Sequence, residues 1–319
     1  MLGLGISSIV ASTQEAGALI GGRSSFTNTN SLFTDGDDDF YNFGMASDLV
    51  NHDSGSVSCW VNIDASNTST TVLWSIWDNN YFTTNGNVTG ASLIELFYFN
   101  TSGSNVFAIS GRYRDETSNG TFANIAVDAK TATSHHGKPN TRVSSDYGDF
   151  GSSDTTYNAH LLKGSWHHIV YSWDKDLDYT HSSTTHSGSL KIYIDGVLRN
   201  HGASTIPGNN ATGSATGIVG SDSGTVFDSI NIGARFNQNN DMDMLLDEWA
   251  LFNTALSDSE VATIYNSGVP ADLSGFSNLA LWLRFGTDGD STGVKATVPG
   301  VTGGTMTNGA RQSTTVPTS

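Results

Sequence analysis

A short segment combines the two kinds of side chain that bind sugars. Residues 74–87 read WSIWDNNYFTTNGN, in which aromatic residues alternate with asparagine and aspartate. Aromatic faces stack on sugar rings, and amide or carboxylate groups bind the ring hydroxyls. Alternatively, Trp74 and Ile76 belong to a core and only the later aromatic residues reach solvent. The predicted glycan-binding residues are Trp77, Asn79, Asn80, Tyr81 and Phe82.

A second segment, residues 34–43, is rich in aspartate and reads TDGDDDFYNF. Calcium prefers several oxygen ligands, and an Asp-Gly turn supplies carboxylate and carbonyl oxygens together. The other interpretation is a solvated acidic turn. A third acidic segment, with Asp174, Asp176 and Asp178, has the alternate spacing of a calcium loop. It lacks the glycine and the distal glutamate of such a loop, which favours a solvated loop.

Two pairs of adjacent histidines, His135 with His136 and His167 with His168, raise the question of a transition-metal site. Adjacent side chains on a strand point to opposite faces, so each pair is expected to be packed or hydrogen-bonded instead. The sequence contains no glycine-rich phosphate loop after a strand.

Strands must position these side chains, because short runs of period-two alternation recur along the chain. Clusters of Gly, Asn, Asp and Ser bound the runs, which is typical of strands joined by turns. The pattern predicts an all-β fold, an antiparallel two-sheet sandwich or jelly roll. The runs are residues 57–63, 93–99, 169–173, 190–194, 229–235, 244–252 and 279–285.

One tight hairpin and one short helix have strong local signals. Asp195-Gly196 separates two strand-like runs, and both positions tolerate the positive φ of a two-residue turn. Residues 257–260 read SDSE, a capping box, and predict a helix over residues 258–267 that lies on the sandwich. Residues 112–163 and 175–187 are poor in alternation and are interpreted as inserted loops, where binding residues often lie.

Composition bounds the class of protein. The chain has 319 residues, enough for one large β domain or two ordinary ones, and only 14% of them are charged. A net charge of -17 disfavours binding to nucleic acid or to anionic lipid. Cys59 is the single cysteine, which excludes an intrachain disulfide and a cysteine-based zinc site. We interpret it as a small buried apolar residue.

The first residues look like an assembly arm. Residues 1–14 lack the basic start and the sustained apolar core of a secretion signal, and no run approaches the roughly 20 apolar residues of a membrane span. We therefore expect synthesis in a cytoplasm and no membrane insertion. Residues 1–23 are too apolar for a free tail and too glycine-broken for a lone helix. Alternatively, the arm folds back over its own sandwich. Its proposed contact residues are Leu2, Leu4, Ile6 and Ile9.

The order of the strands resembles the concanavalin A-like, laminin G-like lectin/glucanase superfamily. The resemblance rests on the segments GSWHHIVY (164–171), GSLKIYIDGVLR (188–199), SINIGAR (229–235) and LDEWALFNTAL (246–256), with TDGDDDFYNF and SVSCWVN (56–62) upstream. It covers residues 24–285. Residues 272–309 are most similar to copies in virion proteins of tailed marine phages.

The resemblance implies a jelly roll that recognises sugars or proteins through a rim or a concave face, often with a structural calcium. It places the calcium at Asp35, Gly36, Asp38 and Asp247. It does not imply catalysis, because the hydrolytic members carry two glutamates separated by an aspartate on one strand. The five glutamates here, at positions 15, 95, 116, 248 and 260, show no such run. Asp247 and Glu248 are adjacent, so their side chains are expected to leave a strand on opposite faces.

These observations predict that the chain is a non-enzymatic, lectin-like structural protein of a phage virion. We expect it to be made in the host cytoplasm and exposed on the particle surface. The expected domains are residues 1–23 as the assembly arm, 24–285 as the jelly roll and 286–319 as an extension packed on the domain or on a neighbour. Expected partners are other virion proteins, further copies of the chain and surface glycans. The alternatives are a free carbohydrate-binding module and, less favoured, a diverged glycoside hydrolase.

Overall fold

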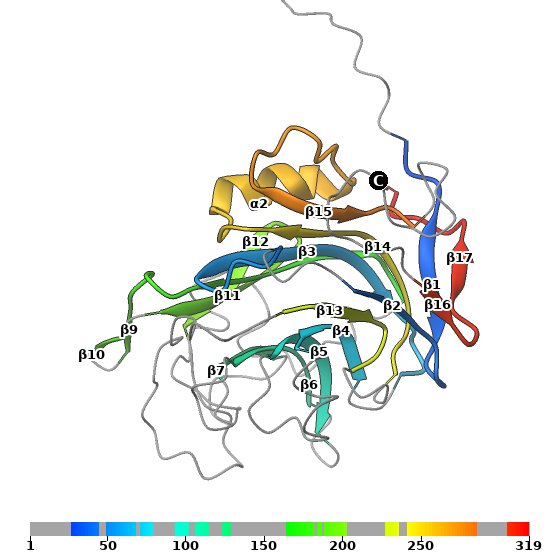
Figure 1. Ribbon diagram of the computed structural model, residues 1–319, viewed down its shortest axis with the longest axis horizontal. Coiled ribbons are helices and arrows are strands. Elements are labelled where there is room, and N and C mark those ends of the chain that lie inside the picture. The colour runs from blue at the N-terminus through cyan, green and yellow to red at the C-terminus, as the bar shows by residue number, and fades with distance from the viewer. Residues whose placement is uncertain are drawn as a thin grey trace, which may run out of the picture.

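The computed structural model describes residues 27–44, 49–67, 71–78, 93–101, 106–114, 123–128, 164–181, 184–186, 188–202, 227–235, 241–285 and 305–318. These residues form two packed antiparallel sheets and one α-helix, which confirms the predicted jelly-roll sandwich. Figure 1 shows the sheets as two layers with the helix on the outer side of one of them. That sheet is called sheet I below, and the other is called sheet II.

Sheet I is built around the long central strands β3 and β14. Its strand order is β12-β11-β8-β3-β14-β1-β17, and β15 also pairs with β14 beyond the end of β1. The strands are β1 (Ser31–Asp35), β3 (Ser54–Ile63), β8 (His167–Asp174), β11 (Ser189–Ile194), β12 (Val197–Gly202), β14 (Asp243–Phe252), β15 (Leu279–Leu283) and β17 (Arg311–Ser313).

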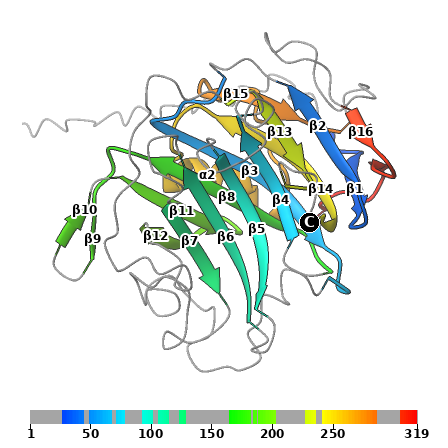
Figure 2. The same ribbon diagram turned by 60° about the horizontal axis from the view of Figure 1, so that its bottom comes forward.

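Sheet II has the strand order β16-β2-β13-β4-β5-β6-β7, and Figure 2 shows several of these strands side by side. A separate two-stranded ribbon, β9 (Tyr179–His181) with β10 (Thr184–His186), projects from the connection between β8 and β11. The strands of sheet II are β2 (Phe40–Gly44), β4 (Thr71–Trp77), β5 (Leu93–Thr101), β6 (Val106–Arg114), β7 (Ala123–Asp128), β13 (Ser229–Ile232) and β16 (Thr305–Thr307).

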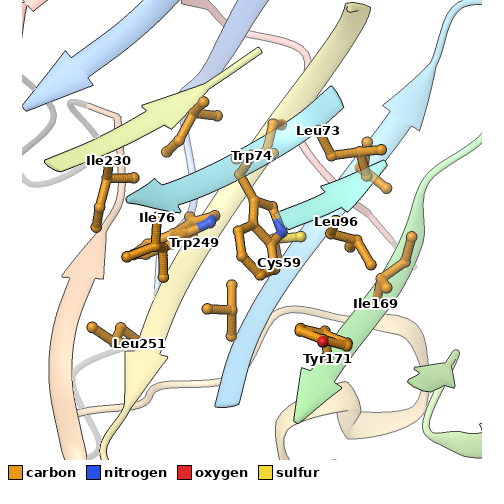
Figure 3. Packing of buried hydrophobic residues seen from close by; sticks show 14 of the residues in the cluster. Cys59, Leu73, Trp74, Ile76, Leu96, Ile169, Tyr171, Ile230, Trp249 and Leu251 are labelled. Carbon is orange, nitrogen blue, oxygen red and sulfur yellow. The ribbon is translucent and has the colours of Figure 1, made fainter. Parts of the chain in front are cut away.

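The core lies between the sheets and is lined by alternate residues of their strands (Figure 3). Trp74 of sheet II meets Tyr171 and Trp249 of sheet I, with ring centroids 6.0 and 6.2 Å apart. All three rings are fully buried, as is Cys59, which agrees with its interpretation as a small apolar residue. A Cβ at Gly111 would lie 2.2 Å from a ring carbon of Tyr171, so this position requires glycine.

The predicted hairpin and helix are both present. Asp195 and Gly196 join β11 to β12 with φ of 51° and 76°, the left-handed pair that a two-residue hairpin turn requires. Helix α2 (Asp258–Tyr265) begins with the predicted capping box of Ser257 and Glu260 and buries Val261 and Ile264 against sheet I. Among the described residues, no helix is long and apolar enough to cross a membrane.

The sandwich differs from the sequence-based expectation in two places. The stretch 112–163, interpreted as a loop insertion, contains the strand β7, whose alternation is weak because alanine and asparagine fill several of its positions. In addition, both sheets take in strands beyond residue 285. Strand β16 pairs with β2 and strand β17 pairs with β1, so the C-terminal segment 305–313 joins the two sheets along one side. Residues 1–26, which contain the predicted assembly arm, lie outside the described part.

Candidate functional site

The predicted glycan-binding segment begins at the end of β4. Trp74 and Ile76 point into the core and are fully buried, as the alternative interpretation expects for them. Trp77 points to the opposite face of sheet II and is 7% exposed. The other four predicted residues, at positions 79–82, lie outside the described residues. The structure therefore places the start of this segment on the outer face of sheet II.

A row of polar side chains crosses that outer face at one level of the sheet. Asn42 of β2 is in register with Asn231 of β13, Asn231 with Ser75 of β4, and Ser75 with Glu95 of β5. The residues on either side of this level, such as Ile76, face the core. The register continues at the backbone level to Thr305, Arg112 and Asn124, which are all polar. We call this line of residues the polar row.

Hydrogen bonds link the polar row into one network. The Asn42 amide donates to Asn231 Oδ1 over 2.5 Å, and the Asn231 amide donates to the carbonyl oxygen of Arg235 over 2.9 Å. The Ser75 hydroxyl donates to the carbonyl oxygen of Ala234 over 3.4 Å. Ser75 and Asn231 are buried, so these bonds offset the cost of removing their polar groups from water.

Glu95 is the charged member of the polar row, and Arg235 is its partner. The Arg235 guanidinium donates to both carboxylate oxygens, over 3.2 Å from Nε and 3.1 Å from Nη2. Glu95 is 1% exposed, whereas the Arg235 side chain is 27% exposed, so the cation reaches solvent and the carboxylate does not. Such a bidentate pair fixes the arginine in one geometry. Sequence reasoning noted that Glu95 stands alone but missed Arg235, because the pairing spans 140 positions in the sequence.

The acidic turn between β1 and β2 gathers more carboxylates than the sequence indicates. The register places Asp243 of β14, not Asp247, opposite Asp35. Burial, together with the charges of Asp64 and Asp35, raises the pKa of Asp243 to about 6. Asp39 is buried, and its carboxylate accepts hydrogen bonds from the backbone N–H groups of Asp35 and Gly309. Burial and the neighbouring carboxylates therefore both disfavour the ionised form of Asp243 beside this turn.

The predicted calcium ligands do not come together. Asp247 lies four positions beyond Asp243 along β14, so it is separated from Asp35, Gly36 and Asp38 at the turn. Within the described ranges, no group of three or more His, Cys, Asp or Glu side chains is arranged to hold a metal ion. A calcium ion at the acidic turn would therefore depend on backbone carbonyl oxygens as well as carboxylates.

Asp247 instead forms a buried pair with Glu248, which corrects the expectation that their side chains leave β14 on opposite faces. The register with β3 shifts between Asp247 and Ala250, and Glu248 has a φ of 50°, which marks a β-bulge with a left-handed residue. The Glu248 backbone N–H donates to Asp247 Oδ1 over 2.8 Å. Burial and the charge of Glu248 raise the pKa of Asp247 well above its usual value.

Three polar contacts hold this pair, and a fourth ties Arg284 to the segment before β1. Asn28 donates to Asp247 over 2.8 Å, and the Trp282 indole donates to Glu248 over 2.5 Å. Arg284 donates to Glu248 over 3.3 Å and to the carbonyl oxygen of Thr27 over 2.5 Å. The pair thus fastens the segment before β1 and the end of β15 to β14, at the place where β14 changes partner from β1 to β15.

His167 and His168 point to opposite sides of β8, as expected. His168 is fully buried and shares a hydrogen bond of 2.8 Å with the Ser58 hydroxyl. Burial lowers the pKa of His168 to about 4, against a smaller opposing effect of Asp195, so its ring is neutral at pH 7. His167 lies 2.8 Å from an Asp195 oxygen on the adjoining hairpin turn. His135 and His136 lie outside the described residues.

Comparisons with known proteins agree with this architecture. A family model described as the concanavalin A-like lectin/glucanases superfamily matches residues 117–262, which supports the resemblance seen in the sequence. No curated protein matches the sequence.

Several solved structures are similar in fold. A proposed carbohydrate-binding protein from Bacteroides ovatus is 13% identical with a TM-score of 0.49, covering 92% of this chain and 62% of that one. A heptameric pentraxin from Limulus polyphemus is 11% identical with a TM-score of 0.41, covering 75% and 82%. The receptor-binding domain of botulinum neurotoxin D is 12% identical with a TM-score of 0.40, covering 76% and 44%. The chain thus spans less than two thirds of the Bacteroides and toxin chains.

Proposed function

We propose that the protein is a non-enzymatic, lectin-like binding protein and that the outer face of sheet II recognises carbohydrate. The observation that carries this proposal is the polar row, which crosses the strands of that face in register. The buried members of the row, Ser75, Asn231 and Glu95, fix in place two groups that reach solvent, the Asn42 amide and the Arg235 guanidinium. Such groups on a rigid sheet can bind the hydroxyl or acidic groups of a sugar chain. The superfamily match of residues 117–262 supports the same class of function.

The aromatic segment belongs to the same face. Trp77 follows Ser75 of the polar row by two positions on β4, and residues two apart on a strand share a face. In the sequence, Asn79, Asn80, Tyr81 and Phe82 follow directly after this end of β4. In this proposal the rings of Tyr81 and Phe82 stack on sugar, and Asn42 together with Arg235, the partner of Glu95, binds hydroxyl or acidic substituents.

A glycan array probed with the purified full chain tests the proposal, and the variants are then measured by titration with the bound glycan. Tyr81→Ala and Phe82→Ala should weaken binding about tenfold, because a stacked ring contributes about 1.4 kcal/mol. Asn42→Ala should weaken it as well. Asn278→Ala is the matched control, since Asn278 is, like Asn42, a half-buried asparagine, and it lies on the connection into β15. Binding to no glycan, or equal binding by all of these variants, would overturn the assignment.

The finer role we propose is that of a structural protein on the surface of a phage virion, made in the host cytoplasm. Supporting it are the similarity of residues 272–309 to virion copies of this superfamily and the apolar, glycine-broken segment 1–23. Burial of its leucine and isoleucine side chains on neighbouring subunits, at about 1.5 to 3 kcal/mol each, would offset the cost of ordering the arm. Repetition over a symmetric particle would multiply the effect.

Two measurements separate the virion role from a free carbohydrate-binding module. Mass spectrometry of purified particles should detect the chain at a fixed copy number relative to the major capsid protein. A variant that starts at Ser24 should fold, as judged by circular dichroism, but should be lost from the particles. If the chain is missing from particles while the glycan array is positive, the free module is the correct assignment.

A further inference from the structure

A hydrogen-bonded Ser–His–Asp chain lies at the start of β8 in sheet I, beside the hairpin turn between β11 and β12. Ser165 Oγ is 2.9 Å from His167 Nε2, and His167 Nδ1 is 2.8 Å from Asp195 Oδ2. The two contacts place a hydroxyl, an imidazole and a carboxylate in the order that activates a serine nucleophile. Sequence patterns do not reveal this arrangement, because the carboxylate comes from the hairpin turn 28 positions away.

The carboxylate end of the chain is rigid and ionised. The His168 backbone N–H donates to Asp195 Oδ1 over 3.0 Å, while the Asp195 backbone N–H donates to the carbonyl oxygen of His168 over 2.8 Å. Burial alone would raise the pKa of Asp195, but the hydrogen bonds from His167 and from the His168 backbone N–H, and the attraction of the His167 ring in its protonated form, lower it below the usual value. The left-handed turn at Asp195 and Gly196 fixes the direction of the carboxylate.

This carboxylate sets the tautomer of His167. An ionised carboxylate only accepts hydrogen bonds, so Nδ1 of His167 carries the proton. Nε2 is then the basic nitrogen, and the Ser165 hydroxyl donates to it. Ser165 is exposed, whereas His167 is 18% exposed in its side chain, so a reagent can reach the hydroxyl while the imidazole stays anchored.

We propose that Ser165 is an acyl-acceptor site, activated by His167 and Asp195, that takes the acyl group of activated esters. Ser165 Oγ forms a bond to the ester carbonyl carbon as its proton passes to His167 Nε2. The bond from that carbon to the alcohol oxygen then breaks, and the departing oxygen takes the proton from Nε2. The products are an acylated Ser165 and one free alcohol. His167 acts as the base, and Asp195 is a positioning residue that holds the tautomer.

Peptide-mapping mass spectrometry of the full chain after treatment with 4-nitrophenyl acetate tests the proposal. We expect acetylation of Ser165 to be at least about tenfold faster in the wild type than in His167→Gln, since general-base assistance contributes that much or more. Asp195→Asn should also slow it while preserving the hairpin, because asparagine tolerates positive φ. Ser259 is the internal control, because it is an exposed serine whose hydroxyl lies 3.2 Å from Ser257 Oγ.

Acetylation of Ser165 at the same rate in His167→Gln, or at the rate of Ser259 in the wild type, would overturn the proposal. So would labelling confined to lysines and the N-terminus. Equal rates in Asp195→Asn and the wild type would remove the role of the carboxylate. Near-ultraviolet circular dichroism confirms that each variant is folded before labelling. Glycan binding is measured on the same samples, so a failure here is independent of the outcome for sheet II.

Discussion

At the scale of single residues, His168 shows how burial converts a titratable group into a pH-dependent term in stability. The folded state lowers its pKa to about 4 by burial, whereas the unfolded chain has the ordinary value of 6.5. At a pH between these two pKa values, His168 is protonated in the unfolded chain and neutral in the folded chain. The free energy of unfolding must therefore fall as the pH drops from 6.5 to 4, and this contribution is constant below 4.

We predict that His168→Gln removes this acid-dependent loss. Glutamine can keep a hydrogen-bonding group near Ser58 but cannot titrate. Relative to the variant, the wild type should lose about 3 kcal/mol of unfolding free energy between pH 6.5 and pH 4. Urea unfolding across that range measures the difference, with His167→Gln as the control on the exposed side of β8. A wild-type-minus-variant difference that does not change with pH would contradict the prediction.

Residue types alone did not reveal the arrangement of Asp247 and Glu248. A strand of regular geometry would send these neighbours to opposite faces, which is what the sequence predicts. A left-handed glutamate at a bulge is disfavoured by local sterics, so only the surrounding contacts, from Asn28, Trp282 and Arg284, hold it there. Local preference cannot predict a conformation that distant residues impose.

At the scale of elements, the turn between β11 and β12 depends on glycine for two separate reasons. Gly196 has a φ of 76°, and a Cβ added there would lie 2.7 Å from the Tyr265 ring at the end of α2. The first feature is a backbone requirement, and the second is a packing contact between the hairpin and the helix. Other glycines have only the backbone feature or neither feature. Substituting them therefore separates the cost of the backbone strain from the cost of the packing contact.

We predict that Gly196→Ala destabilises the protein more than Gly164→Ala. Gly164 has a φ of 71° but no heavy atom within 4 Å of its added Cβ, so alanine there costs only the backbone strain, about 1 to 2 kcal/mol. Gly275→Ala, with neither feature, should be within about 0.5 kcal/mol of the wild type. Chemical unfolding of the three variants gives the order. Equal losses at Gly196 and Gly164 would show that the Tyr265 contact has no cost.

Calcium at the acidic turn is a prediction at the same scale. An ion held by the turn carbonyls and the carboxylates of Asp35 and Asp38 would stabilise only the native state and would relieve the repulsion that raises the pKa of Asp243. Thermal melts should then show a lower midpoint in chelator than in calcium. Asp38→Asn should reduce that response, and Asp176→Asn, in the loop after β8, should not. Equal midpoints with and without chelator would rule the ion out.

The sequence-based predictions succeed where the interacting residues are close in the sequence and fail where they are far apart. The Asp195-Gly196 hairpin and the capping box of α2 depend on residues within four positions of each other, and both are confirmed. The polar row depends on the register of strands far apart in the chain, so sequence reasoning could find Glu95 but not its partner Arg235. The outcome for Tyr81 and Phe82 stays a prediction, because these residues lie outside the described part.

At the scale of the whole molecule, the C-terminal segment 305–313 connects the two sheets. Its strands β16 and β17 pair with β2 and β1, so one short segment covers an edge of each sheet. The turn between them is fastened to the acidic turn, since Asn308 donates to the carbonyl oxygen of Asp38 over 2.9 Å and Gly309 N–H donates to the buried Asp39 carboxylate. Short covering strands of this kind also protect a sheet from pairing with other chains.

We predict that removing residues 305–318 destabilises the sandwich by at least about 2 kcal/mol, because the buried Asp39 carboxylate loses a hydrogen-bond donor and β1 and β2 lose their outer partners. The exposed strand edges should also make the variant associate at high concentration. Urea unfolding measures the first effect, and sedimentation velocity at several concentrations measures the second. Asn308→Gly is the matched control, because it removes the exposed contact with Asp38 and glycine tolerates the φ of 56° at this position; this variant should stay monodisperse. If the truncated chain has unchanged stability and no added association, the sandwich is complete without residues 305–318.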